Sequence, residues 1–159
     1  MAKIAEKLRL SQAAIGGITE HAESAYPSEC CGIVAVLRCK GREVEKVYRL
    51  RNILDSPNRI SAQDYAGSSR KRYFAEPGQL LRVLREIEAH GGQLRIIYHS
   101  HVDADARFSE DDRTAALLDG RPAYPGVVYL VVSVRNRRAD ELRAFQWNGA
   151  EFAEVRFGD

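Results

Sequence analysis

Residues 94–112 read LRIIYHSHVDADARFSEDD and decide both the local fold and the chemistry of this chain. The apolar run Leu94 to Tyr98 predicts a buried strand that leads directly into His99-Ser-His101. Alternate side chains of a strand point the same way, so the imidazoles of His99 and His101 can reach one ion from one face. The end of this strand is therefore a candidate metal site.

A capped helix is predicted after the following loop, from about Glu110 to Leu118. Ser109 and Asp112 have the spacing of a capping box, and Asp112 then lies in the first helical turn, where the helix dipole favours a carboxylate. From there its carboxylate can turn back toward the strand end. Two histidines and one carboxylate are three ligands, which leaves the fourth position of a catalytic zinc site open.

Each part also has a structural interpretation. A Ser-x-x-Asp pair alone is a common helix cap, and histidines on strands often make structural hydrogen bonds. Only the combination favours a metal. The other two histidines are predicted to be structural, because His21 lies on a predicted helix and His90 near the end of another.

The rest of the chain predicts helices interspersed with hairpins. Ser11 to Tyr26 has apolar residues at helical spacing, with Ser11 as N-cap and Pro27 as the stop. The further elements expected are the hairpin of Gly32–Leu37 and Val44–Leu50 turning at Lys40-Gly41, a helix from Pro77 that ends at His90-Gly91-Gly92, the strand Val127–Val134, and a hairpin of Glu141–Trp147 and Phe152–Phe157 turning at Asn148-Gly149. Residues 59–62 are a candidate short strand, and residues 63–74 have no readable pattern.

This order of elements predicts an α/β sandwich with a central mixed β-sheet flanked by helices. At 159 residues we expect one domain over residues 1–159, and the 45% of hydrophobic residues suits an ordinary globular protein. The formal charge of +2 gives no reason to expect nucleic acid as a partner. No signal sequence or membrane span is apparent, so the expected location is cytoplasmic, without membrane attachment. The oligomeric state cannot be predicted.

The cysteines support the same location. Cys30, Cys31 and Cys39 are an odd number without Cys-x-x-Cys spacing, which is typical neither of a disulfide framework nor of a cysteine zinc site. We expect small, buried strand residues.

The motif His99-x-His101, seven residues, Ser109-x-x-Asp112 resembles the signature of the JAMM (MPN-plus) zinc metalloproteases. Glu29-Cys-Cys-Gly32 is similar to the small bacterial branch of that family, as are residues 124–133 and 142–145. The resemblance implies a JAMM/MPN, cytidine-deaminase-like fold and one zinc per chain, bound by the two histidines and the aspartate. It further implies Glu29 as general base and Ser109 as the residue that stabilises the tetrahedral intermediate. Spacing alone does not select Glu29 over Glu20 or Glu23.

This branch includes peptidases that release cysteine or amines from the C-terminus of ubiquitin-like sulfur-carrier proteins, for which we expect a Gly-Gly tail. The resemblance therefore implies such a carrier as partner and hydrolysis of a peptide or isopeptide bond after its tail. The alternatives are a JAMM peptidase for cell-wall or phage-tail peptides, a non-catalytic MPN-type interaction module, and a non-haem iron site built from the same three ligands.

Two features are specific to this chain. Family members usually have proline after the second histidine, where this chain has Val102, and because proline fixes φ we expect a looser loop. The basic run Ser68-Ser-Arg-Lys-Arg72 is expected to be a solvated face, with a docking patch for an acidic carrier as the alternative.

Overall fold

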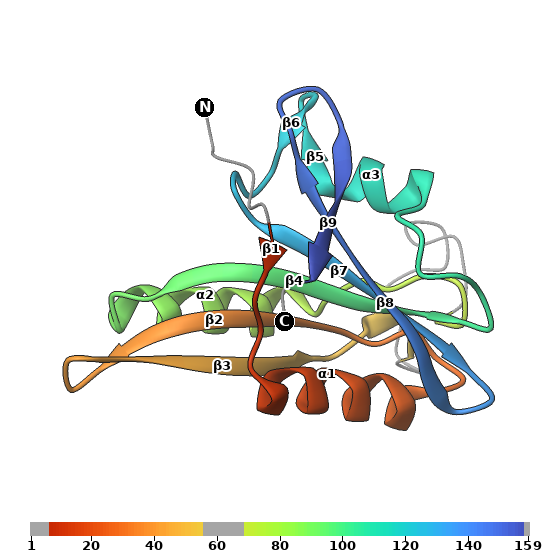
Figure 1. Ribbon diagram of the computed structural model, residues 1–159, viewed down its shortest axis with the longest axis horizontal. Coiled ribbons are helices and arrows are strands. Elements are labelled where there is room, and N and C mark those ends of the chain that lie inside the picture. Colours follow the sequence, from red (N-terminus) through yellow and green to blue (C-terminus); the bar gives the residue numbers. More distant parts are fainter. Residues whose placement is uncertain (1–6, 56–68, 158–159) are drawn as a thin grey trace.

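The structure of the protein, a computed structural model, describes residues 7–55 and 69–157. Within these residues, seven strands form one mixed sheet in the order β1-β9-β8-β7-β4-β2-β3, and two short strands, β5 and β6, form a separate hairpin (Figure 1). In the large sheet β4 pairs with β7 in parallel, as β1 does with β9, and the other pairs are antiparallel. The predicted mixed sheet flanked by helices is confirmed. None of the described helices has the length and apolar character needed to cross a membrane.

The helices and strands have the following bounds. The helices are α1 (Gln12–Ala25), the 3-10 turn η1 (Ile53–Asp55), α2 (Pro77–Ala89) and α3 (Glu110–Ala116). The strands are β1 (Lys7–Leu8), β2 (Cys31–Cys39), β3 (Arg42–Leu50), β4 (Gln93–Val102), β5 (Leu117–Leu118), β6 (Arg121–Pro122), β7 (Val128–Arg135), β8 (Arg138–Trp147) and β9 (Phe152–Phe157).

Local signals account for most of these boundaries. Ser11 caps α1, its hydroxyl accepting a hydrogen bond from the backbone N–H of Ala14, as predicted. Pro27 follows Tyr26, the C-cap residue of α1. Helix α2 begins at Pro77, in the first turn, where the N–H that proline lacks would have no partner within the helix. Lys40 and Gly41, both with positive φ, form the turn of the β2–β3 hairpin. The two predicted helices and this hairpin are confirmed.

Strands β2, β3 and β4 extend one to four residues beyond their predicted ends, and β7 is shifted by one residue. Two further boundaries differ because of turns. Helix α3 ends at Ala116 rather than Leu118, because Asp119 and Gly120 adopt positive φ and turn the chain into the β5–β6 hairpin. Strand β8 begins at Arg138 rather than Glu141, because Asn136 and Arg137, also at positive φ, make a tight turn after β7. The candidate strand at residues 59–62 lies outside the described residues.

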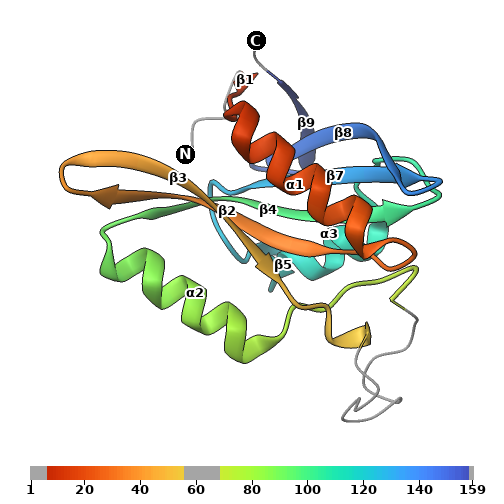
Figure 2. The same ribbon diagram turned by 90° about the horizontal axis from the view of Figure 1, so that it is seen from below.

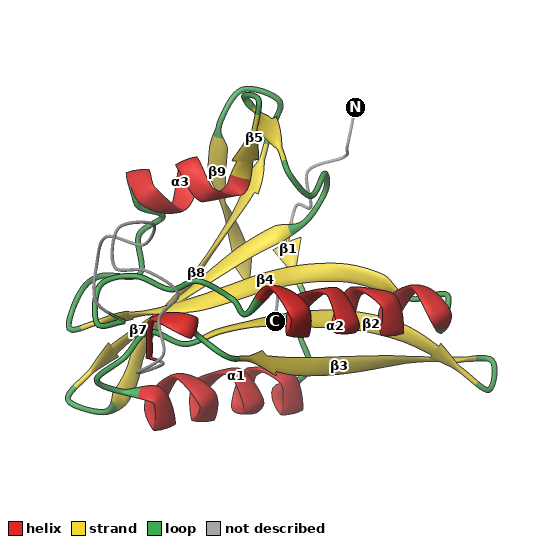
Figure 3. Cartoon of the chain, turned by 180° about the vertical axis from the view of Figure 1, so that it is seen from behind, coloured by secondary structure: helices red, strands yellow, loops and turns green. Residues whose placement is uncertain are grey.

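The sheet carries hydrophobic packing on both faces. Helix α1 covers one face, where Ile18 and Ala22 contact the buried side chains of Ile96, Tyr98 and Leu130. Helix α2 lies on the other face, over alternate residues of β2, and α3 packs over β7 and β8 on that same face. Figure 2 shows α1 and α2 on opposite sides of the sheet, and Figure 3 shows α2 and α3 separated from each other. Helices α2 and α3 therefore cover different parts of this face.

Candidate metal centre and cavity

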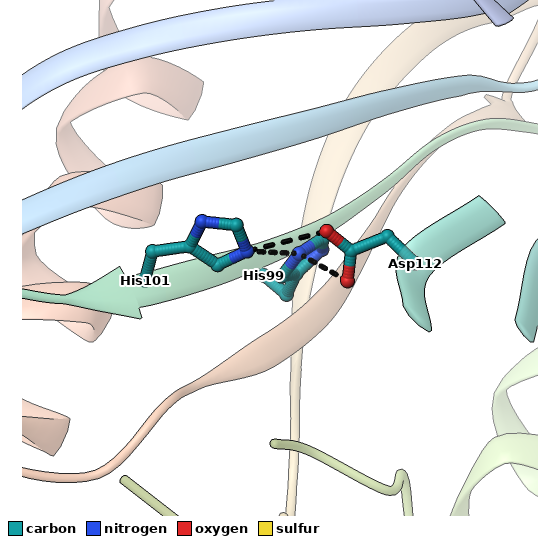
Figure 4. A group of neighbouring side chains, drawn as sticks. All are labelled: His99, His101 and Asp112. Atoms are coloured by element: carbon teal, nitrogen blue, oxygen red, sulfur yellow. Dashed lines mark hydrogen bonds and ion pairs between the residues drawn. The ribbon is translucent and has the colours of Figure 1, made fainter. Parts of the chain in front are cut away.

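His99, His101 and Asp112 meet at the carboxyl end of β4. The two histidines lie on the sheet face shared by α2 and α3, while Tyr98 between Ile97 and His99 packs toward α1. Asp112 is in the first turn of α3 and points back to the strand (Figure 4). Nε2 of His99 is 3.1 Å from Oδ1 of Asp112, and Nε2 of His101 is 3.2 Å from Oδ2. The structure brings together the three residues that the spacing singled out.

The three side chains fit a zinc ion. Their ligand atoms lie within 4.8 Å of one another, and the two Nε2 atoms are 3.2 Å apart. Zn–N bonds of about 2.05 Å at tetrahedral angles place two ligand nitrogens about 3.3 Å apart. Two imidazole nitrogens and a carboxylate that converge in a buried place can share a cation, since buried charged groups are usually paired or bind metals. The donor set and its spacing therefore suit zinc.

The tautomer of His101 and the neutral form of His99 suit metal binding too. Nδ1 of His101 is 2.8 Å from the carbonyl oxygen of Asp105, which can only accept, so Nδ1 carries the hydrogen and leaves Nε2 with its lone pair. Burial lowers the pKa of His99 and so favours its neutral form. Burial also opposes the charge on His101, but hydrogen bonds to Asp112 and Asp105 outweigh it and raise that pKa. The two histidines hold the pKa of Asp112 below its usual range in spite of burial.

Glu29 lies in the same cavity as the candidate metal ligands, two residues before the start of β2. Strand β2 runs antiparallel to β4 with Cys31 opposite His99, and this pairing brings Glu29 beside the site. Its side chain is 6% exposed, and burial raises its pKa to about 8, with Asp112 adding to the shift and His101 opposing it. A cation held by the three ligands would lower that pKa again.

The alternative glutamates lie elsewhere. Glu20 on α1 pairs with Arg49 at 3.1 Å, and Glu23 accepts a hydrogen bond from the backbone N–H of Ala139 on β8. Neither lines the cavity. Of the three glutamates that the spacing left open, the fold places Glu29 alone at the cavity.

Ser109 is the N-cap of α3, and its capping box with Asp112 serves the site as well. The hydroxyl oxygen accepts from the backbone N–H of Asp112 at 3.1 Å, and the Ser109 N–H donates to Oδ2 of Asp112 at 2.9 Å. The second bond fixes the carboxylate that faces the histidines. The first leaves the hydroxyl hydrogen of Ser109 available to donate into the cavity that this residue lines.

The loop after His101 is held by several hydrogen bonds despite Val102. Val102 continues the parallel pairing with Val134, and the next residue, Asp103, has positive φ and donates its N–H to the Val134 carbonyl. The Ser133 hydroxyl donates to the carbonyl of Ala104 at 2.7 Å. The expected loosening is therefore countered by contacts with β7.

Asn52 joins Glu29 to the segment that runs over the metal centre. Its side-chain amide donates to the carbonyls of Glu29, at 3.0 Å, and Arg72, at 3.1 Å, and its oxygen accepts from the Phe74 N–H at 3.0 Å. Between the last two residues, the ring of Tyr73 stacks on His99 with 4.6 Å between ring centroids. The sequence analysis missed both Asn52 and Tyr73, because neither belongs to a periodic segment or a motif.

A cavity of about 570 Å³ extends from the candidate metal centre over β2 and β4, and its walls include residues of both α2 and α3. Its metal end is polar, with Glu29, His101, Ser109 and Asp112. Its far part is apolar, with walls that include Ile33, Leu80, Leu94, Ile97, Ala116 and Tyr129. Arg72 and Asp111, which both line the cavity, form an ion pair at 3.1 Å, so one member of the basic run is paired with α3.

A family model described as prokaryotic homologs of the JAB domain matches residues 11–148. The chain belongs to this family. The match covers every element that builds the site, from α1 to β8. The resemblance to JAMM proteins inferred from the motif is thereby confirmed.

The similar proteins differ in how much of their own length the match covers. The JAB chain is 29% identical to a desampylase from Haloferax volcanii over 153 residues, which are 94% of each protein, and 28% identical to a CysO-cysteine peptidase from Mycobacterium tuberculosis, over 83% of this chain and 77% of the peptidase. It is also 30% identical to a tail tip assembly protein K from an Escherichia phage, over 65% of this chain but only 34% of the phage protein.

Solved structures agree on the fold of the JAB chain. A solution structure of a Desulfitobacterium hafniense protein has a TM-score of 0.67 at 22% identity and covers 94% of this chain and 90% of its own. One from Salinibacter ruber has a TM-score of 0.59 at 23% identity, with coverage of 96% and 92%.

The remaining predicted residues have structural roles. Nδ1 of His21 is 2.7 Å from the hydroxyl of Tyr98, and His90 ends α2 with Nδ1 2.9 Å from the carbonyl oxygen of Glu86. The three cysteines are free. Cys30 and Cys31 are buried and Cys39 is half-buried, so the expected burial holds for the adjacent pair.

Proposed function

We propose that this JAB chain is a zinc-dependent peptidase that cleaves the peptide or isopeptide bond after the C-terminal Gly-Gly of a ubiquitin-like or sulfur-carrier protein, releasing cysteine or another amine. The observation that carries the proposal is one cavity containing a three-ligand cation site, a buried glutamate and a hydroxyl donor. The relatives named desampylase and CysO-cysteine peptidase support the carrier as substrate class.

His99, His101 and Asp112 would hold the zinc, one per chain. When bound, zinc supplies a Lewis acid that polarises the scissile carbonyl and makes water more acidic. Glu29 takes a proton from the attacking water, whose oxygen bonds to the carbonyl carbon. The Ser109 hydroxyl donates a hydrogen bond to the carbonyl oxygen as negative charge develops there. Glu29 then passes the proton to the leaving nitrogen as the C–N bond breaks, and no covalent intermediate is required.

The segment beside the metal centre offers a free strand edge for the carrier tail. Asn52 and Ala75 form an antiparallel bridge flanked by the bonds Ile53 N–H to Phe74 carbonyl and Glu76 N–H to Arg51 carbonyl. In this pattern the backbone groups of Ala75 point away from Asn52.

Within residues 7–55 and 69–157, the backbone N–H and C=O groups of Tyr73 and Ala75 have no hydrogen-bond partner, and both residues line the cavity. An extended tail can pair with this edge and lead its last glycines to the metal centre, with an upstream apolar side chain in the far part of the cavity.

A fusion substrate tests the proposal. A small carrier ending in Gly-Gly, joined through that C-terminus to cysteine or to a short peptide, is incubated with the zinc-loaded chain and analysed by mass spectrometry. We expect cleavage directly after the second glycine, loss of cleavage after chelation, and recovery on adding zinc. Replacing the second glycine with alanine should lower kcat/KM more than tenfold. An intact fusion under these conditions would contradict the proposal.

The similarity to a phage tail tip assembly protein supports a second candidate, the hydrolysis of cell-wall or phage-tail peptides. Purified cell-wall peptides in the same assay discriminate the two. Cleavage of those peptides together with an intact carrier fusion would favour the second candidate, and binding of a carrier without any hydrolysis would favour a non-catalytic interaction module.

A further inference from the structure

The two histidines of the metal centre are held in different ways. A histidine that binds a metal through one ring nitrogen usually donates the other N–H to a carboxylate, carbonyl or water, which fixes the ring. His101 follows this rule through Nδ1 and the carbonyl of Asp105. Nδ1 of His99 is buried and has no hydrogen-bond partner among the residues that the structure describes, although the residue is 0% exposed. Among the described residues, no hydrogen bond at Nδ1 orients this ring, whose other nitrogen, Nε2, faces Asp112.

The side chain that contacts the His99 ring is Tyr73. The two ring planes are 25° apart with 4.6 Å between centroids, a stacked arrangement. The ring of His101 is tilted by 56° to that of His99, so it does not stack in the same way. The planar contact of Tyr73 restricts rotation of the His99 ring about its χ2 angle. It therefore does sterically what a hydrogen bond does for His101.

Tyr73 itself is held from both sides. Its neighbours Arg72 and Phe74 are each hydrogen-bonded to the side chain of Asn52, which is 4% exposed, and the Phe74 carbonyl also accepts from the Ile53 N–H at 2.9 Å. These bonds fix the backbone on either side of Tyr73. Asn52 thus supports Tyr73, and Tyr73 in turn supports His99.

We propose that Tyr73 is a positioning residue for the metal centre, which orients His99 by ring stacking in place of the missing hydrogen bond to Nδ1. The inference rests on the metal site of the proposed function, but not on the identity of the substrate. It concerns the ring and not the hydroxyl group of Tyr73, because only the ring contacts His99.

Zinc affinity, measured by competition with a chromophoric chelator, tests this inference without using activity. We expect Tyr73→Leu to weaken zinc binding about 3- to 10-fold, the worth of one aromatic contact. Tyr73→Phe keeps the ring and should stay within twofold of wild type. Phe74→Leu is the matched control, since it removes an aromatic ring from the same segment, and should also stay within twofold. With cobalt in place of zinc, the visible absorption bands should change in Tyr73→Leu and not in Tyr73→Phe.

The outcomes separate this inference from the proposed function. Equal zinc affinity in Tyr73→Leu and Phe74→Leu would overturn it, and so would an equal loss in Tyr73→Phe and Tyr73→Leu, which would assign the effect to the hydroxyl. A wild-type chain that binds no zinc would instead contradict the metal site. Should Tyr73→Leu fail to fold, Tyr73→Met, which is flexible, apolar and without a ring, replaces it with the same expectations.

Discussion

Gly32→Ala should destabilise the protein strongly, because Tyr98 occupies the space that a side chain would need. A Cβ at Gly32 would lie 2.2 Å from Cζ of Tyr98 and 2.3 Å from its hydroxyl oxygen. Carbon atoms in contact are normally about 3.5–4.0 Å apart, so the ring must move by more than about 1 Å. Tyr98 is 0% exposed and hydrogen-bonded to His21, so it has no free space to enter.

The expected cost combines two effects. Overpacking of a core costs about 1–3 kcal/mol, and loss of the hydrogen bond between Tyr98 and His21 adds about 1 kcal/mol. We therefore expect Gly32→Ala to lower the free energy of unfolding by about 3 kcal/mol, or the Tm by about 6–12 °C for a chain of this size. Urea unfolding monitored by circular dichroism measures the change.

A double-mutant cycle identifies the cause. In Tyr98→Leu the ring is absent, so adding Gly32→Ala should cost little, and the two changes should couple by about 2–3 kcal/mol. Gly16→Ala is the control, because a Cβ there meets nothing within 4 Å on helix α1, and it should be neutral or slightly stabilising. Additive effects of Gly32→Ala and Tyr98→Leu, within about 0.5 kcal/mol, would refute the reasoning.

Three further predictions concern pH, catalysis and thiols. Burial, with a smaller contribution from Arg49, lowers the pKa of His21 from 6.5 to about 4, so the unfolded state binds more protons than the folded state between these pH values. The free energy of unfolding should therefore fall by about 2 kcal/mol as the pH drops from 6.5 to 4. In urea titrations, His21→Gln should lose this part of the pH dependence. Ser109→Ala should lower kcat for the carrier fusion about 10²- to 10³-fold. The control Ser11→Ala also removes a helix N-cap and should lower the free energy of unfolding as Ser109→Ala does, by about 1 kcal/mol, but should leave kcat unchanged. Equal kcat in the two variants would refute the donor role of Ser109. A thiol reagent should modify only Cys39 in the native protein and all three cysteines in urea, and three fast native thiols would contradict their burial.

The cluster of His99, His101 and Asp112 could be predicted from the sequence because its arrangement is local. Strand alternation places His99 and His101 on one face, and the capping box places Asp112 in the first turn of α3. Both rules act within a few residues. Only the distance between Asp112 and the histidines needed the fold, since the loop between them is set by hydrogen bonds to β7.

The residues around the ligands could not be predicted in the same way. The proximity of Glu29 depends on the antiparallel pairing of β2 with β4, which is a contact between distant parts of the chain, and family resemblance alone had suggested it. Asn52 and Tyr73 lie in segments without periodicity, and they meet Glu29 and His99 only through tertiary structure. The early end of α3 had a readable signal in Asp119-Gly120, a common hairpin turn that the helical pattern obscured.

The central claim is that Glu29 moves the proton in a zinc-dependent hydrolysis at this site. The most direct measurement combines metal analysis and carrier-fusion cleavage on the same preparations of wild type, Glu29→Gln and the control Glu20→Gln, whose glutamate pairs with Arg49 away from the cavity. We predict about one zinc per chain in all three proteins, with kcat lowered at least about 10²-fold in Glu29→Gln alone. Full zinc occupancy with undiminished cleavage in Glu29→Gln would contradict the account.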